Sequence, residues 1–478
     1  MCGGKEMNIL KQNKFEQYYE TTAKTPFKKR ELISYTFGGL GDSILSGMVS
    51  TFFMIFATAV MKISPITIGT ILLITKFVDA FCDPTVGVLM DNTRTKYGKL
   101  RPYILLGGLF WAAMTAMLFI NPSFSSETLK IAYVFIVYTL WGIGFSLFDV
   151  PYWSMSAIIT TDSEKRNSIV SLTRSATTIG ALIVSLTGGL LVSRFASLPY
   201  SGQGYSYLGW IFSLLAAISF VSLFLVSKER VKPQTEKISF KSMIKILKIN
   251  KPLQAYIISQ FLQVLTMVTQ ALTSYYAIYN LGSISLMSFI MVPIMIGFLL
   301  TPVIMPKLLK RVEITKLFFY SSIGSIVVGV IYYVVGYENL TFVFIISIFS
   351  GLFMSMSMTL STLYVVDSID YAEWKTGYRA EGLMFAAQSL TAKIMSALSS
   401  FVAGVLLTMV GFDNSVTTQS SSTLNGIFFM FVLGAGISSL LGSIPLLMCK
   451  YKGQARLNIL EEIAKRRHEA VSESKIIS

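Results

Sequence analysis

Seven ionisable side chains lie within stretches of the chain that otherwise have the composition of membrane-spanning helices. They are Asp42, Lys76, Asp79, Asp83, Asp149, Arg174 and Lys393. A charge at the centre of a bilayer helix costs about 3 kcal/mol on an insertion scale, so these groups are expected to face one another or a wet cavity. Residues in such positions mark ion or substrate paths. The pattern therefore indicates a transporter.

Three of these residues lie on the second apolar stretch. Lys76, Asp79 and Asp83 have the spacing i, i+3, i+7, which places them on one stripe of a helix. Two carboxylates about 6 Å apart repel by roughly 3 kcal/mol at an effective dielectric constant near 20. We therefore expect a cation, a proton or Lys76 between them. An ion pair that only holds helices together is the alternative, and a cation or proton site is the preferred interpretation.

The fourth apolar stretch has the same spacing in Ser146, Asp149 and Trp153. An acid beside a tryptophan can hold a polar ligand that also has an apolar face, and a sugar is such a ligand. Arg174 is a natural counter-ion for Asp149 or Asp42, and its planar guanidinium suits vicinal hydroxyls or a carboxylate. The alternative for Trp153 is an aromatic residue that only packs between helices.

The second half of the chain has one ionisable residue in an apolar stretch, Lys393, which follows Gln388 and Ser389. We expect Lys393 to approach Asp79 and Asp83 across a central cavity and to couple the two halves.

Composition and hydropathy predict the fold class. Hydrophobic residues make up 53% of the chain, charged residues 14%, and the mean hydropathy is +0.62, which indicates an all-α integral membrane protein. Runs of about 20 apolar residues predict transmembrane helices. The twelve runs are 35–61, 66–90, 103–121, 130–156, 168–192, 207–227, 253–280, 284–305, 317–336, 340–366, 383–410 and 425–448.

A long polar loop at 228–252 divides these helices into two groups of six. The predicted organisation is an N-terminal segment at 1–34, a six-helix bundle at 35–227, a second bundle at 253–448 and a tail at 449–478. Two bundles around a site near the middle of the membrane are typical of secondary transporters.

Charge predicts the orientation. Of the 40 Lys and Arg residues, 34 fall in the termini and loops on one side of the predicted membrane and three on the other. The positive-inside rule therefore places both termini in the cytoplasm and the chain in the cell membrane. This asymmetry also accounts for the net charge of +15, so we expect no nucleic-acid partner.

The sequence has no pattern that indicates an enzyme. Its three cysteines are scattered, its one histidine lies in the polar tail, and no nucleophile–base pair or phosphate-binding glycine loop is present. We expect no cofactor and no metal other than a coupling Na⁺.

Two loops on the predicted cytoplasmic side carry opposite charges. A basic loop follows the second helix, and the loop at 367–379, which follows the tenth, is rich in acids. Positive-inside bias explains the first loop but not the second. We therefore predict an ionic latch between the bundles. Its members are Arg94, Lys99, Asp367, Asp370, Glu373 and Arg379.

Two strings connect this chain with a known family. They are Asp-Pro…Asp-Asn-Thr-Arg…Gly-Lys at 83–99 and Asp-x-Pro-Tyr-Trp-Ser at 149–154. With them the chain resembles the glycoside–pentoside–hexuronide:cation symporters, the branch of the major facilitator superfamily that includes melibiose permease. The resemblance implies a major facilitator fold and cation-coupled sugar uptake by alternating access.

The resemblance also implies roles for particular residues. Asp79 and Asp83 match the cation-binding acids of the family, and Ser146 matches a hydroxyl ligand. Independently of the resemblance, their place among the intramembrane charges leads us to expect a coupling role for Lys76 and a substrate-binding role for Asp42. The positions that match sugar binding or coupling are Asp149, Trp153, Arg174, Gln388, Ser389 and Lys393.

Three departures from the family pattern bear on specificity. Asp42-Ser43 stands where the permease has a Lys-Asp pair, Met358 replaces a tryptophan, and Cys82 replaces an asparagine beside the second cation-binding acid. The last change removes a hard oxygen ligand and leaves both H⁺ and Na⁺ as coupling ions.

We expect a monomeric symporter of a glycoside or related sugar with a monovalent cation. One alternative is a transporter of an amphipathic, lipid-like or steroid-like solute, which Met354, Met356 and Met358 would suit. A more remote alternative is a membrane sensor that does not transport.

Overall fold

The structure is a computed structural model of the chain. It describes residues 21–22, 25–122, 124, 126–160, 163–195, 202–230, 248–376, 381–416, 418–456, 458–459, 461–463 and 465–466. Within these ranges all the named secondary-structure elements are helices. One isolated β-bridge joins Thr95 and Gly98. The chain is therefore all-α, as predicted.

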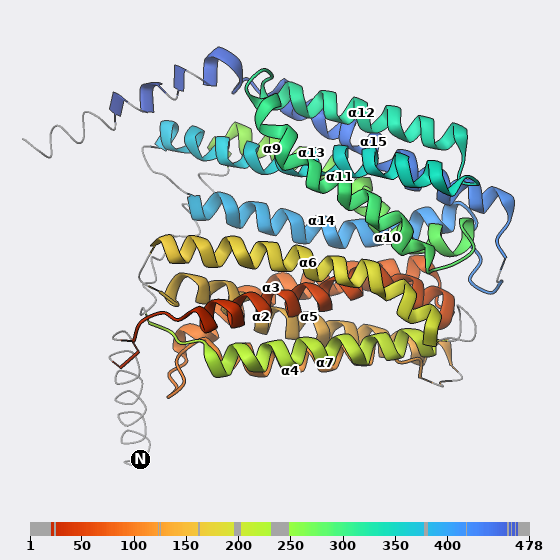
Figure 1. The fold of residues 1–478 in the computed structure, drawn as a ribbon, viewed down its shortest axis with the longest axis horizontal. Coiled ribbons are helices and arrows are strands. Elements are labelled where there is room, and N and C mark those ends of the chain that lie inside the picture. The colour runs from red at the N-terminus through yellow and green to blue at the C-terminus, as the bar shows by residue number, and fades with distance from the viewer. Residues whose placement is uncertain are drawn as a thin grey trace, which may run out of the picture. The chain divides into compact units, whose positions relative to one another are not determined.

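The helices of the first half match the first six predicted crossings (Figure 1). They are α2 (Lys29–Met48) with the π-helices η1 (Val49–Phe53) and η2 (Phe56–Val60), α3 (Pro65–Asn92), α4 (Arg101–Leu118), α5 (Glu127–Ile158), α6 (Ser163–Phe195) and α7 (Gln203–Val226).

The second half matches the other six crossings. They are α9 (Lys251–Leu262) with α10 (Val264–Tyr275) and η3 (Tyr276–Asn280), α11 (Leu286–Leu309), α12 (Ile314–Val335), α13 (Leu340–Thr376), α14 (Glu381–Met409) and α15 (Ser421–Met448).

Eleven helical runs in the described residues are long and apolar enough to cross a membrane. The remaining crossing is α2, which is less apolar because it begins with charged residues and contains Asp42. Together with η1 and η2 it forms continuous helix from residue 29 to residue 60, which is more than enough to span the hydrocarbon core. The prediction of twelve transmembrane helices is therefore confirmed.

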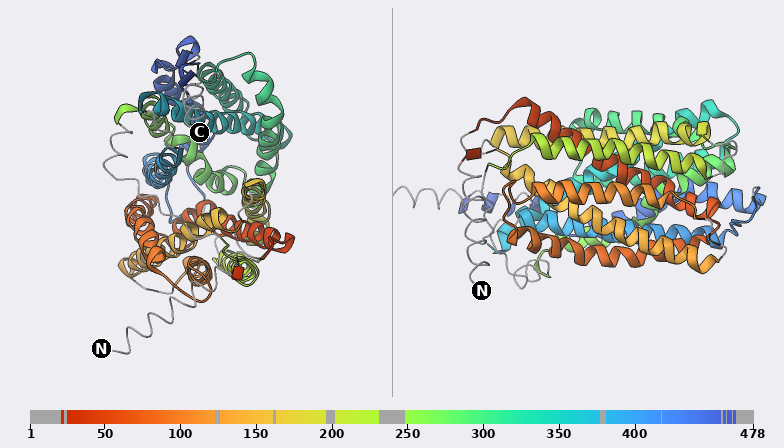
Figure 2. Two further views of the ribbon diagram at one scale, coloured as in Figure 1. Left: turned by 90° about the vertical axis from the view of Figure 1, so that its left-hand side faces the viewer. Right: turned by 90° about the horizontal axis from the view of Figure 1, so that it is seen from below.

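The described residues form two compact units. The first consists of the described residues within Met1–Thr235 and of two short segments from later in the chain, within Gly282–Ser288 and Phe412–Thr418. The second consists of the described residues within Glu236–Leu281, Phe289–Gly411 and Gln419–Ser478. Within each unit the long helices lie lengthwise beside one another, as the two further views show (Figure 2).

Local sequence signals explain where several helices begin. Ser64 accepts a hydrogen bond from the Thr67 N–H ahead of Pro65 in the first turn of α3. Ser420 caps α15 by accepting from the Thr423 N–H. A side-chain oxygen at the N-cap satisfies an N–H group that has no partner in the helix, and proline in the first turn loses no hydrogen bond.

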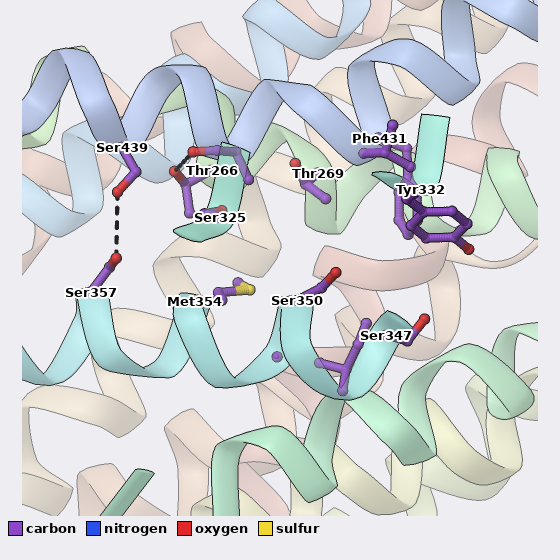
Figure 3. A pocket seen from close by; sticks show the side chains of 14 residues that line it. Thr266, Thr269, Ser325, Tyr332, Ser347, Ser350, Met354, Ser357, Phe431 and Ser439 are labelled. Atoms are coloured by element: carbon purple, nitrogen blue, oxygen red, sulfur yellow. Dashed lines mark hydrogen bonds between the residues drawn. The ribbon is translucent and has the colours of Figure 1, made fainter. Parts of the chain in front are cut away.

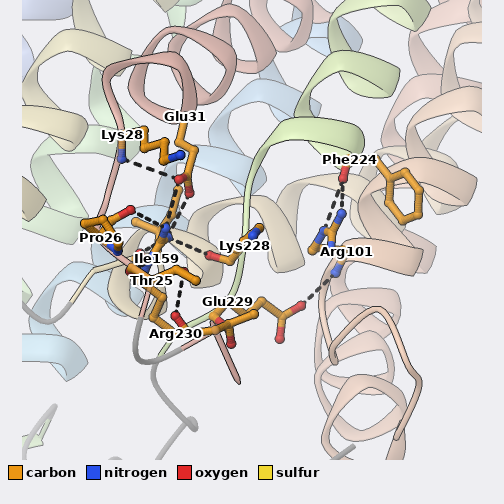
Figure 4. Close-up of polar contacts among 11 residues, drawn as sticks. Thr25, Pro26, Lys28, Glu31, Arg101, Ile159, Phe224, Lys228, Glu229 and Arg230 are labelled. Atoms are coloured by element: carbon orange, nitrogen blue, oxygen red, sulfur yellow. Dashed lines mark hydrogen bonds and ion pairs between the residues drawn. The ribbon is translucent and has the colours of Figure 1, made fainter. Parts of the chain in front are cut away.

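An ion pair buried at one end of the first unit was not anticipated from the sequence. The guanidinium of Arg230 donates to both carboxylate oxygens of Glu31, at 2.8 Å each (Figure 4). It also donates to the carbonyls of Thr25 and Ile159 at 2.9 Å. Arg230 is 6% exposed and Glu31 2% exposed. The pair thus ties the residues after α7 to the start of α2 and the end of α5.

The neighbouring Glu229 is fully buried and occupies the N-terminus of α4. Its carboxylate accepts from the N–H groups of Lys99, Leu100 and Arg101 at 2.8–3.0 Å. A negative charge is stabilised at this end of a helix by the aligned peptide dipoles and the free N–H groups. Gly98, with φ of 100°, allows the approach, because a Cβ there would lie 2.4 Å from Oε1 of Glu229.

Breaking the ion pair between Arg230 and Glu31 is expected to destabilise the protein strongly. Arg230→Met leaves the Glu31 carboxylate buried without its counter-charge, which costs about 3–5 kcal/mol of unfolding free energy. Arg466→Met, which removes an exposed pair with Glu462, is the matched control and should cost at most about 1 kcal/mol. Denaturant unfolding of the purified protein in detergent measures both. If both variants lost the same free energy of unfolding, the buried pair would contribute no more to stability than the exposed one.

Candidate functional site

Lys76 and Asp79 form an ion pair on α3, at the face that packs against α5. The distance from Lys76 Nζ to Asp79 Oδ2 is 2.7 Å. Lys76 Nζ also lies 5.4 Å from the ring centre of Trp141 and 6.0 Å from that of Phe145, both on α5. Aromatic faces stabilise a nearby cation, so α5 helps to hold Lys76 beside Asp79. Neither aromatic residue was singled out in the sequence.

The second oxygen of Asp79 is buried and has no hydrogen-bond partner among the described residues. Asp79 as a whole is 4% exposed. Gly142 on α5 makes room for this oxygen, since a Cβ there would lie 2.0 Å from Oδ1. A buried acceptor without a partner is costly. Asp79 Oδ1 is therefore able to accept a proton or to bind a small cation.

Asp83 lies one turn further along α3 and bonds to α5. Ser146 Oγ donates to Asp83 Oδ1 at 2.7 Å, so the structure brings together the serine and one of the acids that the sequence pairs with it. Carboxylate and hydroxyl oxygens are hard ligands that suit Na⁺, and a carboxylate also accepts a proton. Lys76, Asp79, Asp83 and Ser146 thus form one polar group between α3 and α5, called here the α3–α5 cluster.

A second group lies further along α5. The guanidinium of Arg174 on α6 stacks over the Trp153 ring at 4.4 Å from its centre. Asp149 and Asp42, the latter on α2, are both partly buried and lie within electrostatic range of each other, as do Asp42 and Arg174. These four residues, the Trp153 group, combine an aromatic face with groups that donate and accept hydrogen bonds. Asp42 Oδ1 is buried and lacks a partner among the described residues.

Two tyrosines that the sequence did not single out position the Trp153 group. The Tyr35 hydroxyl on α2 donates to the carbonyl of Tyr152 at 2.6 Å, and the Tyr152 hydroxyl donates to that of Tyr35 at 2.9 Å. Their rings stack with centroids 4.7 Å apart. This reciprocal contact holds α5 against α2 next to Trp153. No sequence signal distinguishes these tyrosines from others in the chain.

The remaining predicted substrate residues belong to α14 of the second unit. Gln388 and Lys393 are partly buried, and Gln388 lies beside the hydroxyl of Tyr256 on α9. Ser389 is on the same helix. The approach of Lys393 to the acids of the first unit remains a prediction.

The predicted latch residues have different surroundings. Arg94 is exposed after α3, whereas Lys99 is 8% exposed beside Glu229. Asp367, Asp370 and Glu373 were predicted to lie in a loop, but α13 continues to Thr376 and carries all three. The apolar run ends near residue 366, and the helix extends beyond it because charged residues are compatible with helix outside the hydrocarbon core.

Asp367 is paired within its own unit. Its Oδ1 accepts from the Arg456 guanidinium of the tail at 2.6 Å. Arg379 lies outside the described residues.

The second unit also contains a small cavity lined by hydroxyl groups (Figure 3). It measures about 60 Å³ and has no ionisable side chain other than Tyr332 in its lining. Ser357 and Ser439 are 3.3 Å apart beside it, and Ser322 lies 2.8 Å from Ser439. Such bonds between small polar residues hold membrane helices together. The charge-bearing sites thus lie elsewhere. The polar residues of the lining are Thr266, Thr269, Ser325, Tyr332, Ser347, Ser350, Ser357 and Ser439.

Comparison with known proteins identifies related sequences and folds. The model of the family described as MFS/sugar transport protein matches residues 34–453. The isoprimeverose transporter of Lactiplantibacillus pentosus is 30% identical, over 86% of this chain and 87% of that protein. The putative glycoside/cation symporter YagG of Escherichia coli is 25% identical, over 95% and 96%. The nucleoside transporter NupG has a similar structure, with a TM-score of 0.63 over 88% of this chain and 99% of that chain, at 15% identity.

Proposed function

The chain belongs to the MFS/sugar transport protein family, and we propose that it imports a glycoside or related sugar together with a monovalent cation. As a member of this family it is a membrane transporter with a major facilitator fold, and not an enzyme. We propose that it acts as a monomer in the cell membrane, with both termini in the cytoplasm. The positive-inside asymmetry of the loops supports this orientation.

The observation that carries the proposal is the unpartnered, buried oxygen of Asp79. It lies in a cluster whose other acid, Asp83, already has the Ser146 hydroxyl. Because no described group bonds to Asp79 Oδ1, this oxygen is available to bind a cation or a proton. Lys76 Nζ occupies only the other oxygen of Asp79, and a carboxylate oxygen can accept H⁺ or coordinate Na⁺, so the coupling ion that we propose is one of these two.

The Trp153 group supports a sugar as the transported solute. Sugar rings have apolar faces that stack on aromatic rings and hydroxyls that bond to carboxylate and guanidinium groups. Ser146 and Asp149, which are three residues apart on α5, connect this group with the α3–α5 cluster. A shared helix is a direct physical route for coupling the cation to the sugar.

Solute counterflow in proteoliposomes tests the proposal. Isoprimeverose belongs in the panel of labelled glycosides because a relative is named for its transport. The assay is run with and without Na⁺ and at several pH values. We expect counterflow of at least one glycoside and its stimulation by one of the two ions. Absence of counterflow for every solute would favour the sensor interpretation.

The methionines of α13 give little support to the alternative that the protein transports an amphipathic, lipid-like or steroid-like solute. Met354 lines the hydroxyl cavity, Met356 is 5% exposed in the core of the unit, and Met358 is 57% exposed. The three side chains therefore do not form one apolar surface. Including steroid and lipid-like solutes in the same counterflow panel decides between the two classes.

The latch is proposed as part of the alternating-access cycle. Opposite charges on the two halves would pair when the site faces outward, and each exposed pair is worth at most about 1 kcal/mol. A network of several pairs can shift a balance between states that differ by a few kcal/mol. Asp367 pairs with Arg456 of its own unit, so a change of Asp367 would also break that pair.

Changing Asp370 and Glu373 to lysine is expected to weaken the latch and slow active transport. Cysteines introduced in the cytoplasmic cavity should then react faster with a maleimide, because the inward-open state is more populated. Charge reversal of the exposed Arg94 in the same protein should restore slow labelling, and exposed Lys375 changed to glutamate is the control. Labelling rates that do not respond to the acid reversals would rule out the latch.

A further inference from the structure

A second cavity, of about 420 Å³, lies where the C-terminal tail crosses the second unit. Its walls come from the end of α11, the start of α12, the last part of α13 and the tail. This volume falls within the range of small-molecule binding sites, which is about 300–1,000 Å³. The polar residues of the lining are Glu313, Thr315, Tyr364, Asp367, Tyr451 and Arg456.

Four residues of this lining carry buried polar atoms that have no hydrogen-bond partner in the part of the chain that the structure describes. The atoms are the hydroxyl oxygens of Thr315, Tyr364 and Tyr451 and the Nε of Arg456. The three hydroxyl residues are each less than 5% exposed. The weakly polar thiol of Cys449 lies beside the Tyr364 hydroxyl. Leaving such groups without partners is costly, so a polar molecule that bonded to them would lower this cost.

The chemistry of these atoms restricts what the molecule can be. The Nε–H of Arg456 can only donate, so the molecule must offer an acceptor oxygen. Burial, with Asp367 and Asp370 nearby, raises the pKa of Tyr451, which therefore remains a protonated donor at neutral pH. The carboxylates of Glu313 and Asp367 also line the cavity. With one guanidinium against two carboxylates, the lining disfavours an anion and can accept hydrogen bonds from ligand hydroxyls.

We propose that this cavity binds a neutral polyhydroxylated molecule, such as a monosaccharide or a cyclitol, and that its occupancy secures the tail on α12 and α13. Hydroxyls both donate and accept, so such a molecule satisfies the carboxylates and the unpartnered donors together. The apolar side chains of Val312, Ile314 and Val366 offer surface to its C–H groups. This site goes beyond the proposed transport function and does not depend on it.

The tail residues are part of both the cavity and the attachment of the tail. The Gly453 N–H donates to Glu313 Oε1 at 2.7 Å, and Arg456 pairs with Asp367 at 2.6 Å. The Tyr451 and Tyr371 rings pack with centroids 5.3 Å apart. A ligand that bonds to Tyr451 and Arg456 binds the attached tail and not the detached one, so it favours attachment.

Alkylation of Cys449 measures this attachment. Cys449 is 9% exposed at the end of α15, beside Tyr364, so its reaction with N-ethylmaleimide is expected to require movement of the tail. The full-length protein in detergent is labelled with increasing myo-inositol, D-xylose or D-glucose, and mass spectrometry of the Cys449 peptide gives the rate. We expect saturable protection by at least one of the three.

Isosteric variants assign the protection to this cavity. Tyr364→Phe and Thr315→Val each remove one donor and should weaken the apparent affinity about three- to tenfold, and the double variant about ten- to hundredfold. Tyr320→Phe, on the exposed face of α12, should leave it unchanged. Asp149→Asn, which alters the proposed transport site, should also leave protection intact, so failure of one site is distinguishable from failure of the other.

Three results would overturn the proposal. They are no protection by any of the three sugars, protection that survives in the Tyr364→Phe/Thr315→Val double variant, and stronger protection by D-gluconate or D-glucosamine than by D-glucose. The first would mean that the cavity holds water only, the second that protection arises elsewhere, and the third that the ligand is charged.

Discussion

Asp79→Asn is expected to abolish uphill accumulation of the substrate while sugar binding persists at reduced affinity. The substitution keeps the shape of the side chain and removes the charge that would hold the coupling cation. Without the ion, the transporter can only equilibrate its substrate. The measurement is uptake into proteoliposomes with an imposed Na⁺ or H⁺ gradient, compared with equilibrium binding to the same preparation.

The Lys76–Asp79 ion pair supplies a sharper version of this test. If the pair only holds α3 in place, the double variant Lys76→Met/Asp79→Asn removes both charges and should recover accumulation. If Asp79 binds the coupling cation, the double variant should remain uncoupled. Asp413→Asn, in an exposed loop where Asp413 accepts hydrogen bonds from Ser415, is the matched control. Accumulation at the wild-type level in Asp79→Asn would remove this residue from the coupling site.

Asp149→Asn and Trp153→Ala are expected to weaken substrate binding by about 10- to 150-fold. This range corresponds to the loss of one charge-assisted hydrogen bond, which costs about 1.5–3 kcal/mol. Trp153→Ala also removes the ring on which the Arg174 guanidinium lies. The Arg174 side chain should then no longer be held in position. The dissociation constant of a solute that the counterflow panel identifies is measured by calorimetry.

Further substitutions distinguish a specific loss of sugar binding from general effects on the protein. Trp153→Phe keeps an aromatic face and should have a smaller effect than Trp153→Ala. Trp210→Ala removes a tryptophan that is 57% exposed on α7 and should leave the dissociation constant unchanged. Unaltered affinity in both Asp149→Asn and Trp153→Ala would mean that the sugar binds elsewhere.

The sequence alone was sufficient to predict the fold class and the transmembrane helices, because membrane insertion depends on local properties. An apolar run of about 20 residues must be helical in a bilayer, since its backbone groups have no other partners there. Predicted runs such as 66–90 and 130–156 therefore agree closely with α3 and α5. The same rule failed at the end of α13, because hydropathy marks the limit of the hydrocarbon core and not the end of the helix.

The stripe of Lys76, Asp79 and Asp83 could also be read from the sequence, because its spacing is a property of one helix. The contacts of that stripe with α5 could not be predicted from the sequence. The Ser146–Asp83 bond, the cation–π contacts of Lys76 and the space that Gly142 leaves for Asp79 join residues more than 60 positions apart. Several serines and glycines of the chain have similar local surroundings, so nothing local selects these.

The same reason applies to the buried pair of Arg230 with Glu31 and to the partly buried pair of Arg456 with Asp367. In the sequence, Arg230 and Arg456 are two of 40 basic residues, most of which follow from the positive-inside bias. Only the tertiary structure distinguishes them, because burial and the position of a counter-charge depend on how distant helices pack. Hydropathy and helical spacing determined which residues share a helix face, and tertiary packing alone decided which of those faces meet.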